Sequence, residues 1–214
     1  MSATKMNGAE SLVRTLIDGG IEVCFTNPGT SEMHFCAALD RFPGLRCVLG
    51  LFEGVVTGAA DGYGRMRDFP SATLLHTGPG LGNGLANLHN ARKARSPVVN
   101  IVGEHATYHI RHDAPLTSDI EGIAAPVSDW VKTSRNAEEV STDGAQAIAE
   151  ARKTPGRIAT LILPADTAWN EASSGATVPS VPNPETVNSN ALDECVRVLR
   201  SGEPVMLLLG NKGL

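Results

Sequence analysis

The sequence predicts an α/β fold in three layers, with a parallel β-sheet between helices that cover both of its faces. Short apolar runs of strand length recur along the chain, and stretches with helical or turn character separate them. Such alternation is typical of a parallel sheet whose crossover connections are helices. With 214 residues, of which 42% are hydrophobic and 19% charged, the chain is long enough for one full domain and part of another.

The first element is predicted to be a helix that begins after Asn7. The Asn7 side chain can cap this helix, and Glu10 stands at the position that completes a capping box. The pair Gly19-Gly20 is expected to end it. One face of the helix carries the apolar side chains Ala9, Leu12, Val13, Leu16 and Ile17.

A buried strand is predicted next, over residues 21–26, and it leads into a turn at residues 27–29, Asn-Pro-Gly. Thr30 or Ser31 can cap the helix that is expected from there to about Phe42. The remaining strands are predicted in four apolar runs, at residues 46–52, 71–76, 97–103 and 157–163.

Composition divides the chain into three parts. Residues 1–169 are predicted to form the first domain, and residues 170–188, rich in Ser, Pro, Gly, Asn and Thr, are predicted to be a linker. Residues 189–214 are expected to begin a central α/β domain, as one helix followed over residues 203–214 by one strand with a glycine turn. About 25 residues cannot enclose a core. We therefore expect the sequence to be truncated inside that second domain.

Charge and hydropathy exclude several classes of function. The formal net charge is -5 and no dense run of Lys or Arg occurs, which argues against a nucleic-acid partner and against an anionic membrane surface. The first residues lack the apolar core of a signal peptide, and no run of about 18 apolar residues suggests a membrane span. We expect a soluble, cytoplasmic protein that acts on small molecules.

The candidate functional residues follow the predicted strands. In an open parallel sheet, ligands lie beyond the carboxyl ends of the strands, where loops converge and helix amino ends present N–H groups. After the first strand come Pro28, Gly29 and Thr30, and after the second comes Glu53. After the third come His76 and a glycine-rich stretch, residues 77–84, which contains Asn83. All of them are expected to face one crevice.

Glu53 has two interpretations. It is a first-turn acid that complements the partial positive charge of a helix amino end, which stabilises by about 0.3 to 1 kcal/mol. Alternatively, Leu51, Phe52 and Val55 enclose its carboxyl group and keep it from water, so that it can exchange a proton with a bound heterocycle. The small residues that follow favour close packing against another surface, which supports the second interpretation.

The glycine-rich stretch matches no phosphate-binding motif. Counted from Gly78, a G-x-G-x-x-G pattern puts Asn83 at the third glycine, and counted from Gly80 it puts Leu85 there. The stretch is either a flexible turn between strand and helix or a place where backbone closely approaches a ligand. His76 can likewise be a structural histidine, and Thr30 only a helix cap.

Three histidines, His105, His109 and His112, have the spacing of ligands on one helix face. Gly103 and Pro115 nearby favour a loop instead, and no second cluster of acids or cysteines lies close in the sequence. We therefore predict no metal site from this chain.

Three motifs in order, NPGTSEM, LFEGVVTGAADGYGR and LLHTGPGLGNGLANLHNARKARSPVVNIVGE, resemble the amino-terminal pyrimidine-binding domain of thiamine-diphosphate enzymes. The resemblance covers about residues 7 to 170. The group includes acetolactate synthase, pyruvate oxidase and benzoylformate decarboxylase. This sequence shares two features with benzoylformate decarboxylases, a hydroxyl residue at Thr30 and a histidine at His76. Members of the group hold three α/β domains.

The resemblance implies a role for each candidate residue. Glu53 would hydrogen-bond N1′ of the aminopyrimidine and promote loss of the thiazolium C2 proton, after which a 2-oxo acid substrate is decarboxylated or ligated. Thr30 would contact the substrate carboxylate and His76 would relay protons. Pro28, Gly29 and Asn83 would line the cofactor crevice.

One departure from the family is large. The Gly-Asp-Gly segment and the later Asn that hold diphosphate and Mg²⁺ belong to the third domain, and nothing in this sequence matches them. The resemblance places the active site between subunits of a homo-dimer or homo-tetramer, so we expect this chain alone to be inactive. The alternative hypothesis is a noncatalytic nucleotide-binding or assembly module.

Overall fold

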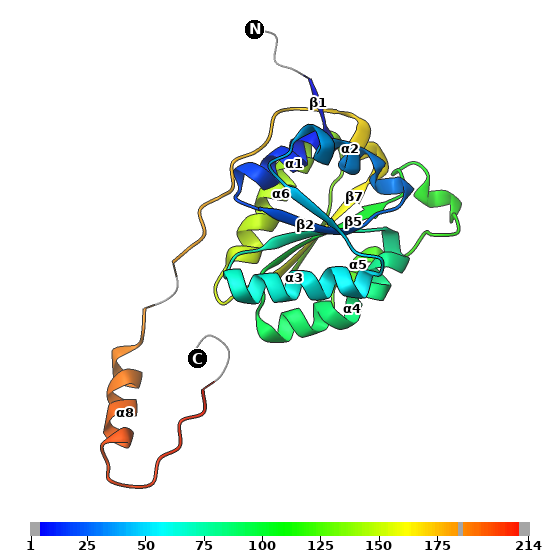
Figure 1. Cartoon of the computed structure of the whole chain (residues 1–214). Coiled ribbons are helices and arrows are strands. Elements are labelled where there is room, and N and C mark those ends of the chain that lie inside the picture. The colour runs from blue at the N-terminus through cyan, green and yellow to red at the C-terminus, as the bar shows by residue number, and fades with distance from the viewer. Residues whose placement is uncertain (1–4, 184–185, 210–214) are drawn as a thin grey trace. The chain divides into compact units, whose positions relative to one another are not determined.

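The computed structural model describes residues 5–183 and 186–209, which divide into two compact units, Met1–Val181 and Pro182–Leu214. The first unit contains six parallel strands in the order β3-β2-β4-β5-β7-β6 (Figure 1). Five of them form at the predicted apolar runs, and the sixth, β6, was not predicted. The strands are β2 (Val23–Asn27), β3 (Arg46–Leu49), β4 (Ser71–Leu75), β5 (Val98–Glu104), β6 (Trp130–Thr133) and β7 (Ile158–Pro164).

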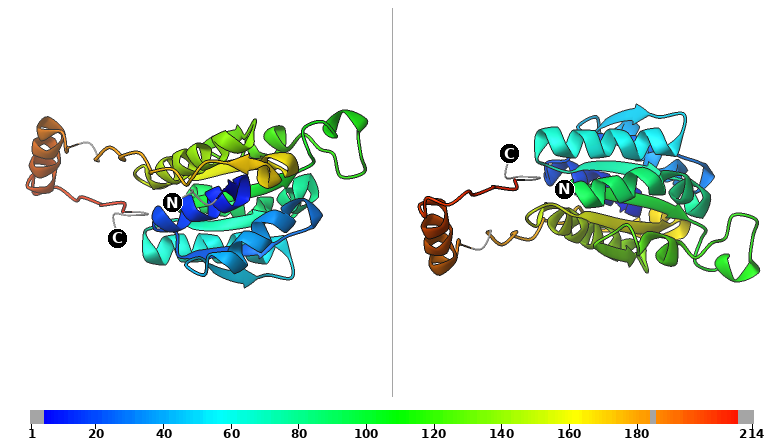
Figure 2. Two further views of the ribbon diagram at one scale, coloured as in Figure 1. Left: turned by 90° about the horizontal axis from the view of Figure 1, so that it is seen from above. Right: turned by 90° about the horizontal axis from the view of Figure 1, so that it is seen from below.

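Helices cover the two faces of this sheet, which gives the three layers visible in Figure 2. One face is covered by α1 (Gly8–Asp18), α2 (Met33–Arg41), α6 (Ala137–Arg152) and α7 (Ala165–Trp169). The other face is covered by α3 (Glu53–Arg67), α4 (Thr77–Ala94) and α5 (Ile120–Ala124). Two short 3-10 helices, η1 (Thr30–Glu32) and η2 (Ile110–His112), lie in the connections.

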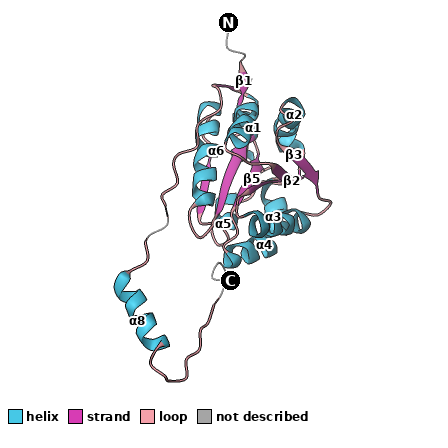
Figure 3. Cartoon of the chain, turned by 60° about the vertical axis from the view of Figure 1, so that its left-hand side comes forward, coloured by secondary structure: helices cyan, strands magenta, loops and turns pink. Residues whose placement is uncertain are grey.

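The central strands contribute to two hydrophobic cores, one on each face. In β5, Val99 and Ile101 belong to the core beneath α1 and α6, whereas Val98 and Val102 belong to the core beneath α3 and α4. All four side chains are fully buried. Successive strand residues point to opposite faces, so burial on both sides requires an unbroken apolar run. Figure 3 shows these strands enclosed by helices.

The amino end of α1 is capped as predicted. The Asn7 side chain accepts a hydrogen bond from the Glu10 amide at 2.9 Å, and the Asn7 amide donates to the Glu10 carboxylate at 3.1 Å. Gly19 is the residue that ends the helix. Gly20 follows with a φ of +86°, in the left-handed region that favours glycine.

The helix predicted to begin at Thr30 or Ser31 starts differently. Residues 30–32 form η1, α2 follows, and neither hydroxyl caps it. The Gly29 amide instead donates to the carboxylate of Glu32 at 2.6 Å. The carboxylate of Glu32 thus satisfies a backbone amide before the helix, whereas a hydroxyl cap would satisfy one inside the first turn.

The glycine-rich stretch at residues 77–84 is also not the loop that the sequence suggested, because it forms the first turns of α4. Glycine costs about 1 kcal/mol in a helix interior, and tertiary contacts offset this cost. A Cβ on Gly84 would lie 2.8 Å from the Thr57 Cγ2 atom of α3, and one on Gly78 would lie 2.3 Å from Ser118. Both glycines therefore allow close packing of α4.

Part of the segment beyond residue 169 packs on the first unit. β8 (Glu171–Ala172) pairs with β1 (Met6–Asn7) in an antiparallel two-stranded sheet. The Ala176 amide donates to the Thr15 hydroxyl at 3.0 Å, and Val178 packs against the core beneath α1. The linker at 170–188 and the boundaries at 169 and 189 stay predictions.

The second unit contains the predicted helix, α8 (Ser189–Leu199). The predicted strand is wrong for residues 203–209, which are irregular; the glycine turn expected after them lies outside the described residues. A strand needs a neighbour for its backbone hydrogen bonds, and the described part of this unit holds no second strand. Within residues 5–183 and 186–209, no helix has the length and apolar character needed to cross a membrane.

Candidate active site

Three neighbouring strands, β3, β2 and β4, bring the candidate residues to one edge of the sheet. Because the strands are parallel, the segments that follow Asn27, Leu49 and Leu75 all leave the sheet on the same side. The Asn27 side chain donates to the Gly50 carbonyl at 3.0 Å and joins the first two of these segments. The sheet therefore gathers the residues that the sequence singled out.

Glu53 is the first residue of α3 and is half-buried. Its Oε2 atom accepts a hydrogen bond from the Asn83 side chain of α4 at 3.1 Å. Its Oε1 atom has no hydrogen-bond partner among the described residues and faces Gly80, on which a Cβ would lie 3.5 Å away. One carboxylate oxygen is thus held by the protein and the other is available to a ligand.

The predicted enclosure of Glu53 by its apolar neighbours is wrong for this chain. Leu51 is 90% exposed, Phe52 51% and Val55 59%. β3 is the edge strand of the sheet, so the residues that connect it to α3 have no further strand beside them. Together with Leu49, which is 65% exposed, these residues form an apolar surface around Glu53 that we call the 49–55 surface.

His76 precedes α4 and contacts both Gly29 and Glu32. A Cβ on Gly29 would lie 2.4 Å from the His76 ring, so only glycine allows this approach. The Nδ1 atom of His76 lies 2.8 Å from Oε2 of Glu32, the same oxygen that accepts from the Gly29 amide. Whichever group carries the shared proton, Nδ1 is engaged and Nε2 is the ring nitrogen left for a ligand.

Glu32 was missed by the sequence analysis. Its side chain is fully buried, and its Oε1 atom has no hydrogen-bond partner among the described residues. This oxygen packs against Gly103 of β5, where a Cβ would lie 1.6 Å from it. Burial raises the pKa of Glu32, while the hydrogen bond from Gly29 and the attraction of His76 act in the opposite direction. Its position three residues after Gly29, as in a capping box, was the available signal.

Replacing Glu32 with glutamine is expected to change how stability depends on pH. Since burial raises the pKa of Glu32 above its ordinary 4.5, the folded state holds this proton at pH values where the unfolded chain has lost it. The wild type should therefore lose stability relative to Glu32→Gln as pH rises from 4.5 through the raised pKa. Denaturant unfolding of both proteins at about pH 4 to 8 measures this difference. If the difference in unfolding free energy between the two proteins did not change with pH, the raised pKa of Glu32 would be contradicted.

Backbone strain lies next to His76. Thr77, the first residue of α4, has a φ of +49°, which is unusual for a β-branched residue. Its side chain is fully buried, and its hydroxyl has no hydrogen-bond partner among the described residues. Strain of this kind persists only where surrounding contacts enforce it, and it is frequent at functional sites.

The remaining predicted residues adjoin this group. Gly80 lies next to both Glu53 and His76, because a Cβ on Gly80 would be 3.5 Å from Glu53 Oε1 and 3.6 Å from His76 Cβ. Thr30 is exposed, and its hydroxyl makes no hydrogen bond to another described residue. Pro28 is half-buried at the end of β2. The structure therefore brings the predicted residues into one neighbourhood.

The three histidines of the 105–112 segment lie in a turn-rich loop that contains η2. The ring centroids of His105 and His109 are 5.7 Å apart, and those of His109 and His112 are 5.6 Å apart. Among the described residues, no group of three or more His, Cys, Asp or Glu side chains could hold a metal ion.

Comparisons with known proteins identify the family of this chain. The family model of the thiamine pyrophosphate enzymes, N-terminal TPP binding domain, matches residues 6–123. "Putative acetolactate synthase large subunit IlvX" of Mycobacterium tuberculosis (strain ATCC 25618 / H37Rv) is 56% identical over 206 residues, which are 96% of this chain and 39% of that protein. Benzoylformate decarboxylase of Pseudomonas aeruginosa is 34% identical over 158 residues, which are 73% of this chain and 29% of that protein.

A solved structure is similar as well. The thiamine diphosphate-dependent 4-hydroxybenzoylformate decarboxylase of Rhodococcus jostii RHA1 superposes with a TM-score of 0.81 at 27% identity, over 92% of this chain and 38% of that one. The chain belongs to the thiamine pyrophosphate enzyme family and corresponds to its N-terminal TPP-binding domain. It spans about two fifths of the length of the first of these relatives. The matches favour this assignment over a noncatalytic nucleotide-binding module.

Proposed function

We propose that this chain is the aminopyrimidine-binding part of a thiamine-diphosphate-dependent enzyme that acts on 2-oxo acids. The reaction is a decarboxylation, by a lyase, or an acetolactate-type carboligation, by a transferase. The observation that carries this proposal is the arrangement of Glu53, whose Oε2 atom is held by Asn83 while Oε1 has no partner among the described residues.

The residues present fit the pyrimidine half of the cofactor. A ring nitrogen that must gain a proton needs an acid within hydrogen-bonding distance, and the free oxygen of Glu53 beside the bare backbone of Gly80 offers such an acid. Pro28 and Gly29 follow β2, and together with Asn83 they would line the pyrimidine ring of the cofactor. When bound, thiamine diphosphate supplies a carbon nucleophile for the substrate carbonyl and an electron sink for decarboxylation.

Each side chain of the site then has a task. Glu53 holds or gives up a proton at N1′ of the pyrimidine ring. Thr30, whose hydroxyl has no partner among the described residues, donates to the substrate carboxylate. His76 moves a proton at Nε2, because Nδ1 is engaged by Glu32 at 2.8 Å. Glu32 positions the imidazole ring of His76 and does not itself touch substrate.

The site is completed by parts of the protein outside this chain. The 49–55 surface exposes four apolar side chains beside Glu53, and an exposed apolar surface of this kind is typical of an interface. We propose that this surface packs against a second subunit of a dimer or tetramer, with the active site between subunits. Mg²⁺ and the diphosphate would be bound by the remaining domains, and the enzyme would be cytoplasmic.

Binding and product measurements on the full-length protein test this function. Isothermal titration should show binding of thiamine diphosphate with Mg²⁺, and weaker or no binding of an adenine nucleotide. Response to the adenine nucleotide alone would contradict the proposal and favour a nucleotide-binding module. Product analysis with pyruvate and with benzoylformate then separates carboligation from decarboxylation.

A further inference from the structure

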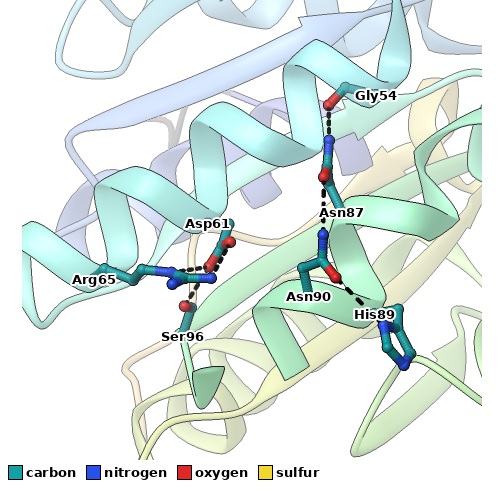
Figure 4. Close-up of polar contacts among 7 residues, drawn as sticks. All are labelled: Gly54, Asp61, Arg65, Asn87, His89, Asn90 and Ser96. Carbon is teal, nitrogen blue, oxygen red and sulfur yellow. Dashed lines mark hydrogen bonds and ion pairs between the residues drawn. The ribbon is translucent and has the colours of Figure 1, made fainter. Parts of the chain in front are cut away.

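Asn87 of α4 makes a hydrogen bond to the backbone immediately beyond the proposed catalytic acid. Its Nδ2 atom donates to the carbonyl of Gly54 at 2.6 Å (Figure 4). Gly54 follows Glu53 in the first turn of α3. A Cβ on Gly58, one turn farther along α3, would lie 3.0 Å from the same Nδ2 atom. The Asn87 side chain thus occupies the space between the two helices.

This contact repeats the one made by Asn83, one turn earlier on α4. Asn83 donates to the Glu53 side chain at 3.1 Å, and Asn87 donates to the backbone of the next residue. Residues four apart lie on the same face of a helix, so α4 presents two amides in a row to the start of α3. Between them, the Thr57 hydroxyl donates to the Gly84 carbonyl at 3.0 Å.

Asn87 carries no charge, and no hydrogen bond joins it to the Glu53 carboxylate. Its other described polar contact is long, since the Asn90 side chain lies 3.4 Å from Asn87 Oδ1. The hydrogen bond of Asn87 reaches the backbone of Gly54, the residue after Glu53, and not the acid itself. It joins the first turn of α3 to α4 at this point.

We propose that Asn87 is a positioning residue that holds the Glu53 carboxylate in its reactive place. The inference rests on the proposed function, because it assigns Asn87 to the acid that this function uses. Catalytic groups that are displaced by about 1 Å can lose on the order of 100-fold in rate. Loss of one backbone contact shifts Glu53 by less, so we expect an effect of about tenfold.

The chain offers a matched control about two turns farther along α3, at Asp61. The Ser96 hydroxyl donates to Asp61 at 2.5 Å and joins α3 to the second residue after the end of α4 (Figure 4). Asp61 also pairs with Arg65 at 2.7 Å. Ser96→Ala thus removes a hydrogen bond to α3, as Asn87→Ala does, but remote from Glu53.

The first measurement needs no cofactor. Amide hydrogen exchange in the first turn of α3 should be about fivefold faster in Asn87→Ala than in the parent, since one hydrogen bond contributes about 1 kcal/mol. Ser96→Ala should leave that turn unchanged. The second measurement is C2-proton exchange of thiamine diphosphate bound to the full-length protein. It should be about tenfold slower in Asn87→Ala and unchanged in Ser96→Ala.

Equal C2-proton exchange in the parent and Asn87→Ala, or equal slowing by both variants, would overturn the inference. If Asn87→Ala does not fold, Asn87→Leu has a side chain of similar size, removes the donor and adds no charge, and the same two measurements apply to it. Glu53→Gln distinguishes the two proposals. If Glu53→Gln abolishes C2-proton exchange while Asn87→Ala leaves it intact, only the positioning role fails; if Glu53→Gln has no effect, the proposed function fails.

Discussion

Replacing Glu53 with glutamine is expected to slow C2-proton exchange of thiamine diphosphate, bound to the full-length protein, by about 100-fold or more. Glutamine keeps the size of the side chain, and its carbonyl can still accept the hydrogen bond that Asn83 now donates at 3.1 Å. Its amide nitrogen, however, cannot exchange a proton with a ring nitrogen. Stability should change by less than about 0.5 kcal/mol, since Glu53 is only half-buried.

A graded control separates proton transfer from position. Asn83→Ala keeps the acid but removes the donor that holds its Oε2 atom, so Glu53 is less well positioned and C2-proton exchange should fall by roughly tenfold. NMR measurement of proton exchange in deuterated water, with a denaturant melt of each variant, covers both properties. A Glu53→Gln variant that exchanges as fast as the parent would remove Glu53 from the mechanism.

The elements that sequence reasoning predicted are those whose signal is local. Strands β2, β4, β5 and β7 are apolar runs because they are covered on both faces, and α1 carries its own capping box. β6 was missed because its residues, Trp130–Thr133, form no apolar run and are not fully buried. Local pattern therefore predicted the centre of the sheet better than its edge.

Part of the site was predictable for a topological reason. Glu53, His76 and Thr30 follow neighbouring parallel strands, and the ends of such strands meet at one edge. Glu32 was not predicted as a site residue, because its role depends on contacts with His76, which follows β4, and with Gly103 of β5. The helical form of residues 77–84 depends likewise on packing against α3 and α5, which no local propensity encodes.

Gly103→Ala should be the most destabilising of these substitutions, at about 3 kcal/mol. The new methyl would lie 1.6 Å from Glu32 Oε1, and the Glu32 side chain is fully buried, so the clash must displace it. Displacing it breaks the hydrogen bond from Gly29 and the contact with His76. The substitution should therefore also impair proton transfer at His76.

Three further variants separate this clash from the general cost of adding a methyl group. Gly62→Ala in α3 adds a Cβ that meets nothing within 4 Å, so it should be neutral or stabilise by up to about 1 kcal/mol. Glu32→Ala removes the atoms that the Gly103 methyl would strike, so the double variant Glu32→Ala with Gly103→Ala should lose less stability than the sum of the two single variants. Denaturant unfolding of the parent, the single variants Glu32→Ala and Gly103→Ala, and the double variant completes the double-mutant cycle. Additive losses would mean that Gly103 does not accommodate Glu32, and the buried acid would then owe its place to Gly29 and His76 alone.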